Sequence, residues 1–424
     1  MKSKIKSLCA ALAVGSMIVT AYADVNTPYS MYGYGVLGER STSMQRQMGG
    51  VGYALQSGRQ INVMNPASYA SIDSLTFLWD MGANMNMQWS KDATGKSHGY
   101  GGGLDYVTME FPLSKFMGMS IGMVPLTQVG YSFGDDIKFG ARQNQGSGGI
   151  TEAYAGVSGK IGGFSVGVNV SYDFGTIQND VYATPSTDGS STSSQSLFEQ
   201  IMEIRDWNIV AGVQYKQPIN RYNSLTLGVT YSPKKSFHGN TWLTLQDLKS
   251  DSYPDTIVKS GMKGKYYSPQ SFGVGLAYTH EKVHKVVVEA DFTLQQWSKA
   301  PFSSLKDDAG QVVFEGMKFA DRQKIAVGGE YTHNVRGSYL ERMPWRIGGF
   351  YTDDYLKIDG NRMKEYGVSL GTGFAAPGGK TMINLGFEWI HRQTNPVNLL
   401  SENYFNIMVG VNFNEVWFFK RKIN

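Results

Sequence analysis

Apolar and polar residues alternate with a period of two along most of the chain beyond residue 73. In the stretch FSVGVNVSYDF, Phe164 and every second residue after it are apolar or aromatic, and the residues between them are small or polar. Successive side chains of a β-strand point to opposite sides, so this pattern predicts strands with one apolar and one polar face. The pattern recurs in the segments 272–279, 285–295, 324–332 and 405–413. The chain is therefore predicted to be all-β.

The alternating segments predict a closed barrel of about fourteen antiparallel strands. The expected strands are 74–88, 102–112, 116–139, 149–159, 163–178, 201–215, 223–245, 265–280, 284–297, 319–335, 344–352, 364–375, 380–392 and 404–414. Short turns are expected after the even strands, for example around Lys160, Pro218, Lys282 and Gly378. Longer polar stretches are expected after odd ones, at 90–101, 179–200, 246–264, 298–318 and 353–363. A soluble β-sandwich would also alternate, but it has no reason to sort its loops in this way, whereas transmembrane barrels do.

The composition agrees with a barrel. Charged residues make up 17% of the chain, below the roughly 25% of a typical soluble domain, and Gly (51), Tyr (25) and Phe (21) are abundant. The formal net charge of +4 includes three lysines in a leader that we expect to be removed. The mature chain is then nearly neutral, and the lack of a basic stripe excludes nucleic acid as an expected partner.

Residues 1–23 are predicted to be a cleaved signal peptide. Lys2, Lys4 and Lys6 precede an apolar run at 8–20, and the small-residue site Ala-Tyr-Ala follows at 21–23. The alternative, an uncleaved anchor, needs about 20 apolar residues, more than this run supplies. Cys9 lies in the leader, so the mature chain would have no cysteine. We expect export to the outer membrane of a Gram-negative cell.

Residues 24–73 lack the clean alternation, and residues 74–424 form the predicted barrel. This first segment is rich in Gly, Ser and Asn, and it holds Met-Gly-Gly-Val-Gly-Tyr-Ala from Met48 and Asn-Pro-Ala-Ser from Asn65. A segment of this length ahead of a fourteen-strand barrel is long enough to fill the lumen as a plug.

The order of leader, M-G-G-x-G-x-A, N-P-A-S and strands resembles the outer-membrane long-chain fatty acid transporter (FadL) family over essentially the whole mature chain. The resemblance implies an N-terminal hatch and a kinked third strand whose bend opens a lateral hole in the wall. The third expected strand contains Pro125, which cannot donate a ladder hydrogen bond. The alternative is that Pro125 only ends a strand before a tight turn.

These expectations predict a channel for the passive uptake of hydrophobic or amphipathic compounds such as long-chain fatty acids. The candidate ligand or gating residues are Asn65, Pro66, Ala67, Gly122, Pro125 and Gly130. The charges expected to face the lumen, either in structural ion pairs or along a ligand path, are Asp173, Lys285, Glu289, Asp291, Lys324, Glu330 and Glu388. A charge on the lipid side would cost about 2–4 kcal/mol for Lys or Arg at mid-depth. The expected partners are membrane lipid, hydrophobic small molecules and the outer-membrane assembly machinery, and the chain is expected to be a monomer. A barrel of the same architecture that acts as a surface scaffold or assembly partner for secreted proteins is the alternative.

Two short motifs match enzyme signatures without the required context. His280-Glu281-Lys282-Val283-His284 fits H-E-x-x-H, which binds zinc only when a helix brings both histidines to one face, and here it joins two expected strands. Residues 33–38 fit G-x-G-x-x-G, but no apolar strand precedes them and no helical pattern follows. No cofactor, no metal and no catalytic residue is predicted.

Overall fold

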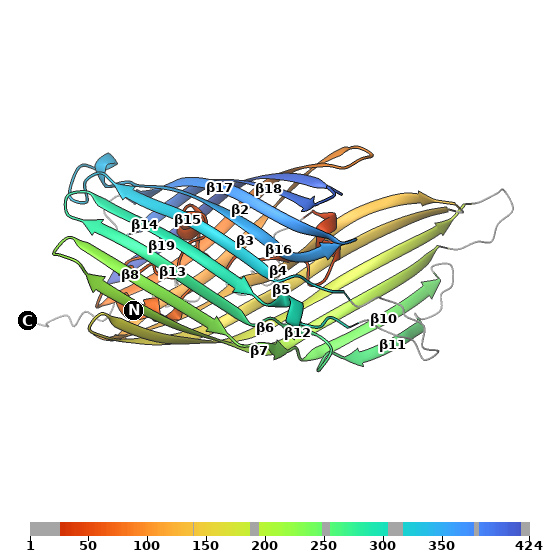
Figure 1. Ribbon diagram of the computed structural model, residues 1–424, viewed down its shortest axis with the longest axis horizontal. Coiled ribbons are helices and arrows are strands. Elements are labelled where there is room, and N and C mark those ends of the chain that lie inside the picture. The colour runs from red at the N-terminus through yellow and green to blue at the C-terminus, as the bar shows by residue number, and fades with distance from the viewer. Residues whose placement is uncertain are drawn as a thin grey trace, which may run out of the picture.

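The computed structural model describes residues 26–416, apart from residue 139 and the segments 187–194, 248–254, 304–316 and 377–380. Within these residues, fourteen strands close into an antiparallel barrel, in which β2–β8 are followed by β13–β19 and β19 pairs with β2 (Figure 1). The barrel strands are β2 (Thr76–Lys91), β3 (Lys96–Ser114), β4 (Met117–Ile137), β5 (Gly140–Ile161), β6 (Phe164–Pro185), β7 (Ser196–Pro218), β8 (Asn223–Ser232), β13 (Ser271–Glu281), β14 (Lys285–Gln295), β15 (Arg322–Thr332), β16 (Pro344–Ile358), β17 (Asn361–Ala375), β18 (Met382–Asn395) and β19 (Ser401–Val416). The predicted fold class and strand number are confirmed.

Short elements occupy the lumen and the loops. They are the 3-10 helices η2 (Pro28–Met31), η3 (Pro66–Ser71), η4 (Trp297–Lys299) and η5 (Leu340–Arg342), the helix α2 (Ser43–Arg46), and the strands β1 (Val36–Leu37), β9 (Lys235–Ser236), β10 (Gly239–Asp247), β11 (Asp255–Gly261) and β12 (Tyr267–Ser268). None of the helices found in the described ranges is long and apolar enough to cross a membrane.

The expected strand 223–245 is wrong as a single element. β8 ends at Ser232, and after β9 the chain enters β10, which pairs with the upper part of β7 and with β11 rather than continuing beside β13. The expected loops 90–101, 179–200 and 353–363 are also wrong in large part, because the flanking strands continue into them as long hairpins. As a result β5, β6 and β7 extend with β10 and β11 well past the rest of the ring (Figure 1).

The connections at the opposite end are mostly short, and we take this end as the periplasmic one, as in barrels of this kind. The turns around Lys160, Pro218 and Lys282 lie there as expected, whereas the connection 333–343 is longer and contains η5. The expected turn at Gly378 lies outside the described residues. The H-E-x-x-H motif spans the turn between β13 and β14, so it has no helical geometry.

The two faces of the wall differ as the alternation predicts. Val170, Phe292 and Ile325 are 45%, 41% and 55% exposed on the outside, whereas Asp173, Asp291 and Lys324 are 2%, 5% and 5% exposed on the inside. An apolar outer belt around a closed barrel indicates a membrane-spanning wall. Trp207 and Trp345 also lie on the outer surface, but Trp297 is buried at 5% exposure and belongs to an internal cluster.

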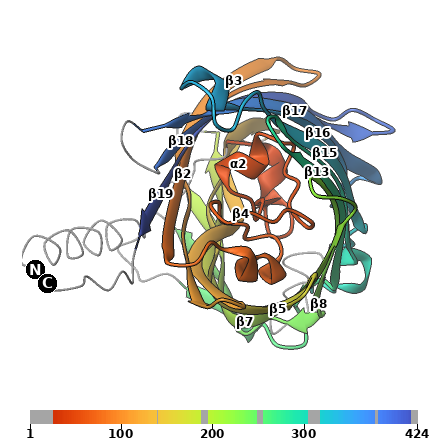
Figure 2. The same cartoon turned by 90° about the vertical axis from the view of Figure 1, so that its left-hand side faces the viewer.

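Residues 26–75 lie inside the ring (Figure 2), and glycines of the wall let them come close. At five places two glycines of neighbouring strands are paired, and a Cβ on either one would fall within 3.0 Å of an atom that is, in most cases, part of the N-terminal segment. The pairs are Gly82–Gly410, Gly371–Gly386, Gly328–Gly348, Gly228–Gly275 and Gly167–Gly212. They face, in the same order, Ser43, Gln47, Met48, Tyr53 and Asn65–Pro66. We call these ten residues the paired glycines.

The M-G-G-x-G-x-A motif is held by two wall carboxylates. The backbone N–H groups of Gly52 and Tyr53 donate to Asp291 Oδ2 at 2.7 and 3.1 Å, and that of Ala54 donates to Glu289 Oε1 at 2.7 Å. Buried N–H groups must be paired, so these carboxylates fix the course of the segment at β14.

Candidate functional site

The wall separates between β3 and β4. These strands pair only from Ser114–Met117 up to Val107–Met123, and beyond that point β3 continues with β2 alone and β4 with β5. No further pairing between the two strands is present in the described part of the chain. The upper half of β4 therefore leaves its neighbour and bends toward the lumen (Figure 2).

Pro125 lies where the strands separate. It has no N–H to donate, and the register between β4 and β5 shifts by one residue between Pro125 and Thr127. Gly122 pairs with Thr108 one position below the last rung of the ladder, and Gly130 lies above the split. Three of the six candidate gating residues thus lie on one strand around its kink, and the strand does not end there in a tight turn.

The edge that β4 exposes is covered by the N-terminal segment. Val36 and Leu37 of β1 pair with Gln128 and Thr127, and the N–H of Gly38 donates to Leu126 O at 2.7 Å. Higher on the strand, the N–H of Thr27 donates to Gly130 O at 2.8 Å, and the Ser30 hydroxyl also donates to this oxygen at 3.0 Å. Residues 27–38 therefore take the place that β3 vacates.

Asn65, Pro66 and Ala67 lie elsewhere, against β6 and β7. The side-chain oxygen Oδ1 of Asn65 accepts a hydrogen bond from Ala67 N–H at 3.0 Å and caps the start of η3, and its side-chain NH₂ group donates to Tyr53 O at 2.7 Å. Asn65 and Pro66 face the paired glycines Gly167 and Gly212. The structure therefore does not bring this motif together with the kink. The contacts of the motif hold the N-terminal segment against β6 and β7.

Two cavities lie on either side of residues 37–39. The first, of about 160 Å³, reaches from Leu37 and Leu126 to Tyr34, Phe237 and Trp297. The second, of about 150 Å³, lies beside Pro125 and is lined largely by polar and charged side chains of β2, β3 and β17–β19. Both cavities share Leu37, Gly38 and Glu39 in their lining. Those three residues form a partition between an aromatic chamber and the space next to the open wall.

Glu39 anchors this partition to the opposite wall. Its carboxylate lies 2.8 Å from Lys324 Nζ and 3.1 Å from Arg322, which is also 3.6 Å from Asp354. Burial raises the pKa of Glu39, but the two cations outweigh this effect and hold it at about 2. Arg40 is ion-paired with Glu152 on β5, so the partition is tied at two consecutive residues.

The aromatic side of this chamber is backed by a cluster of residues far apart in the sequence, of which Tyr34, Phe237 and Trp297 line the cavity itself. Tyr34 packs against Phe237 and Phe302 with ring centroids 5.5 and 5.1 Å apart, and Trp297 lies 4.6 Å from Tyr355. The Tyr355 hydroxyl donates to Gly35 O at 2.6 Å and connects the cluster to the N-terminal segment. This cluster was not predicted from the sequence, because its members come from loops and rims where the alternating pattern has ended.

The charges predicted to face the lumen are inside the barrel. Glu289 and Asp291 accept hydrogen bonds from the backbone N–H groups of residues 52–54. Lys324 forms an ion pair with Glu39, and Lys285 forms one with Glu330 at 2.8 Å. Glu388 pairs with Arg46 of α2 at 2.9 Å, and Asp173 is buried and lines the aromatic chamber. Most of these groups thus hold the N-terminal segment or one another.

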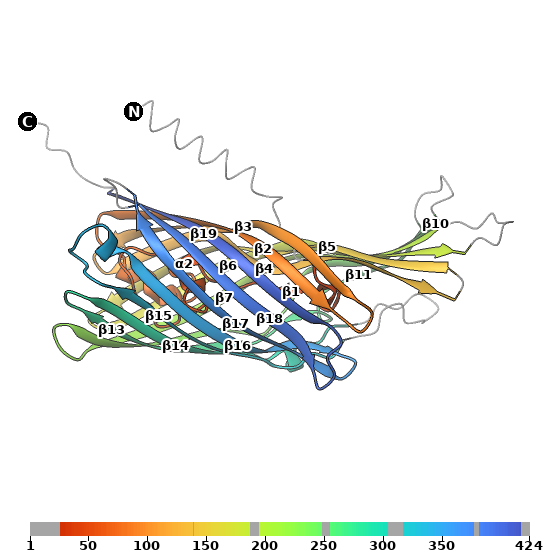
Figure 3. The same ribbon diagram turned by 90° about the horizontal axis from the view of Figure 1, so that it is seen from above.

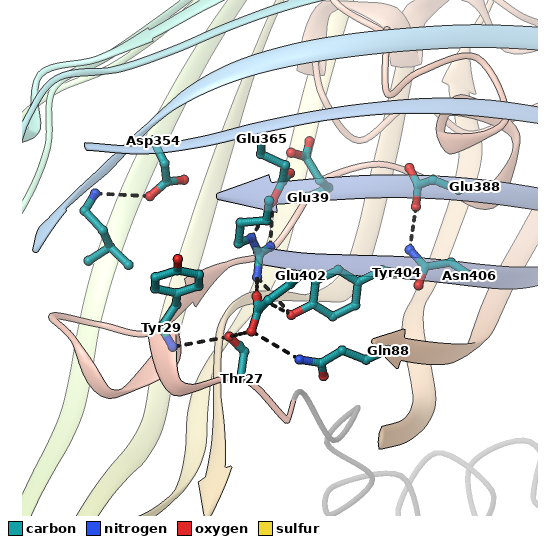
Figure 4. A network of polar contacts seen from close by, with 12 residues as sticks. Thr27, Tyr29, Glu39, Gln88, Asp354, Glu365, Glu388, Glu402, Tyr404 and Asn406 are labelled. Carbon is teal, nitrogen blue, oxygen red and sulfur yellow. Dashed lines mark hydrogen bonds and ion pairs between the residues drawn. The ribbon is translucent and has the colours of Figure 1, made fainter. Parts of the chain in front are cut away.

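A second polar network joins the start of that segment to β19. Thr27 donates to Glu402 Oε1 at 2.6 Å, and Gln88 and Tyr404 donate to the same carboxylate at 3.2 and 2.8 Å (Figure 4). The guanidinium of Arg392 bridges Glu365 at 2.6 Å and Glu402 at 3.6 Å. This network, which the sequence analysis missed, fixes the end of the segment next to the separated strands.

A family model with the description BamG matches residues 1–424. The chain belongs to the BamG family. No curated protein sequence matches it. Solved structures similar to this BamG-family barrel include a Pseudomonas aeruginosa FadL homologue (13% identity, TM-score 0.59, covering 89% of this chain and 99% of that one). They also include the P. putida toluene transporter TodX (15%, 0.59, 90% and 100%) and the CymD monoaromatic hydrocarbon channel (13%, 0.55, 90% and 98%). The predicted resemblance to FadL-like barrels is confirmed for the fold.

Proposed function

We propose that this BamG-family barrel is a passive outer-membrane channel for hydrophobic or amphipathic compounds, and that they leave it sideways between β3 and β4. The main support is the end of the β3–β4 ladder at Val107–Met123, directly below Pro125. The two cavities that meet at residues 37–39 support a path toward that opening. The solved structures that are titled as hydrocarbon channels and toluene transporters share this fold.

The height of the opening agrees with release into lipid. Pro125 lies eight residues above Met117, the first residue of β4 at the periplasmic end. At about 3.3 Å per residue and a tilt of about 45°, this places the kink roughly 19 Å above the start of the strand. The hydrocarbon layer is about 30 Å thick. A molecule that passes β4 at Pro125 would therefore meet acyl chains rather than water.

In this proposal, residues 26–73 act as a hatch with a fixed part and a movable part. Residues 43–66 are seated on the paired glycines and on Asp291, where close packing opposes displacement. Residues 36–40 are held instead by the two-residue strand β1, the hydrogen bond of Gly38 and the ion pairs of Glu39 and Arg40. Residues 27–34 are tied to Glu402 and packed into the aromatic cluster through Tyr34. Displacement of residues 36–40 alone would join the aromatic chamber to the open wall.

The lining of the aromatic chamber favours an amphipathic cargo. Tyr34, Phe237 and Trp297 line one part of its volume of about 160 Å³, and charged side chains, among them Asp173, Asp291 and Arg322, line the rest. Long-chain fatty acids, the class that the FadL resemblance implies, would require both cavities to merge. Uptake should therefore be measured with a small aromatic hydrocarbon and with a long-chain fatty acid side by side.

A disulfide between the movable part and β4 tests the route. Val36 and Gln128 are directly opposed in the β1–β4 pair, a geometry that a disulfide can bridge. We expect Val36→Cys/Gln128→Cys to lose uptake when oxidised and to regain it on reduction. Val229→Cys/Val274→Cys, which joins β8 and β13 in the wall, is the matched control. Uptake by the oxidised Val36–Gln128 variant at the wild-type rate would refute the proposal.

The alternative role, a scaffold or assembly partner for secreted proteins, predicts a different outcome. In that case the oxidised variant would behave like the wild type, and neither probe would enter faster than through a membrane without the protein. A stable protein partner would then co-purify with the barrel while no small hydrophobic molecule does. The shared fold with proteins titled as transporters favours the channel.

A further inference from the structure

A third cavity, of about 450 Å³, lies at the periplasmic end of the lumen. It is formed by the turns that join β5 to β6 and β7 to β8 on one side and by the loop at 56–58 and Ser71 on the other. It shares no lining residue with the two cavities of the proposed channel. Its chemistry is therefore separate from that of the aromatic chamber.

Two lysines face this cavity without a counter-charge. Lys160 lies on the inward face of β5 with the buried Ser158, and Lys216 lies on the inward face of β7 with the buried Gln214. Neither lysine forms an ion pair with any residue that the structure describes. No carboxylate lines the cavity. Nearby Asp73 is paired with Arg59 at 3.4 Å.

The strand register places the two lysines on either side of β6. Lys160 is opposite Ser165, and the N–H of Lys216 donates to Gly163 O at 2.8 Å. Gly163, in the turn before β6, has no side chain, and the residue of β6 that lines the cavity beside the two lysines is the small Ser165. Ser57, Ser71 and Ser165 add hydroxyl groups to the same lining. Two ammonium groups with several hydroxyl donors form a site for a multivalent oxyanion.

The surface beside the cavity favours a lipid as the source of that anion. Ile161 is 87% exposed next to Lys160, and Phe164 and Tyr215 are 48% and 46% exposed on the outer face of the same turns. Exposed apolar and aromatic side chains at the end of a barrel strand lie at the boundary between acyl chains and headgroups. The acyl chains of a phospholipid in the periplasmic leaflet would pack on this outer face, one turn away from the two lysines.

We propose that Lys160 and Lys216 form a phosphate-binding site at the periplasmic mouth, and that its ligand is a phospholipid headgroup or free phosphate. The headgroup would lie between the wall and the loop at 56–58, in contact with both. It would thus bind the N-terminal segment to the wall at the end opposite to the movable residues 36–40. The site does not depend on whether the barrel transports hydrophobic compounds.

The test uses the full-length protein in a zwitterionic detergent without phosphate, and two probes. One arm titrates inorganic phosphate and the other short-chain dihexanoyl-phosphatidylglycerol, each followed by the broadening of its ³¹P resonance. We expect saturable binding that weakens about tenfold in Lys160→Gln and in Lys216→Gln, since each change removes one charge-assisted hydrogen bond to the phosphate. The double variant Lys160→Arg/Lys216→Arg should retain binding.

Lys115→Gln is the matched control, because Lys115 is exposed in the β3–β4 turn but does not line the cavity. The heat-dependent gel migration typical of folded barrels verifies that each variant is intact. Binding of the lipid alone, or of both probes, would support a headgroup site, and binding of phosphate alone would support a site for the free anion. The absence of saturable binding in both arms, or an equal loss in Lys115→Gln, would overturn the proposal.

Discussion

Substitution of the paired glycines should weaken the packing of the N-terminal segment against the wall while leaving the strands of the wall intact. Gly328 on β15 and Gly348 on β16 are opposite each other, and both face the backbone of Met48. A Cβ on Gly348 would lie 2.5 Å from the Met48 carbonyl oxygen, about 1 Å closer than an ordinary contact. The double change Gly328→Ala/Gly348→Ala therefore forces the segment away from the wall.

The magnitude follows from packing. Each added methyl in a close-packed region costs about 1–3 kcal/mol, so the pair should cost roughly 2–6 kcal/mol. Locally the segment is held by the hydrogen bond from Gly49 N–H to Ser369 and by that from Arg346 to Gln47, both 2.9 Å long. Each contributes about 0.5–3 kcal/mol, so the strain is comparable with what holds this stretch. The ladders of β15 and β16 should remain intact, because an alanine fits an extended strand.

The assay is limited trypsin digestion of the folded protein in detergent, with the fragments identified by mass. The side chain of Arg46 is 15% exposed beside this seat, so the wild type should resist cleavage there. We expect the double variant to be cut after Arg46 while the barrel keeps its heat-dependent migration. Gly159→Ala is the control, because the nearest atoms to its Cβ would be 3.9 Å away. Equal resistance and an unchanged melting temperature in the double variant would refute the argument that glycines set the seat.

Four further predictions concern individual residues and the leader. Asp291→Ala leaves two buried N–H groups of the segment without an acceptor and should lower the stability of the seat by about 1–3 kcal/mol for each, measured as a lower midpoint of protease susceptibility. Because the pKa of Glu39 is lowered to about 2, its contribution to stability is present above about pH 4.5 and is lost as the pH falls toward 2; the amide hydrogen exchange of residues 36–38, corrected for the intrinsic pH dependence of exchange, should therefore speed up over this range in the wild type but not in Glu39→Gln. Pro125→Val restores an N–H donor on β4 and should reduce uptake without changing the melting temperature, and unchanged uptake would argue against lateral exit. The intact mass of the purified protein should correspond to a chain that begins at Asp24, whereas a mass that includes residues 1–23 would show that the leader is retained.

The fold class was predictable from the sequence because strand alternation is a local signal. Every second side chain must point to lipid or to the lumen, and this requirement is written into each strand separately. For this reason fourteen strands and the inward side of Asp291 and Lys324 were predicted correctly. Pro125 was also recognisable, since a residue without an N–H disturbs any interior strand.

The paths of several strands were decided by the tertiary structure. Residues 223–245 were predicted as one strand, yet they contain β8, β9 and β10, because a period of two does not say which neighbour a strand will pair with. The hairpins at 90–101 and 179–200 continue beyond the predicted ends for a similar reason: their polar composition resembles a loop, but partner strands satisfy their backbone groups.

The sequence by itself determined that the chain forms strands, which face of each strand is apolar, and where one strand must kink. Only the tertiary structure decided what surrounds that kink: the loss of β3 as a partner, its replacement by residues 27–38, the pairing of glycines across strands, and the aromatic chamber around Tyr34. It also decided that β5 extends with β10 and β11 past the rest of the ring (Figure 3). The physical reason is distance along the chain. Alternation concerns residues two positions apart, whereas these contacts join residues up to several hundred positions apart, and their geometry depends on register and barrel closure.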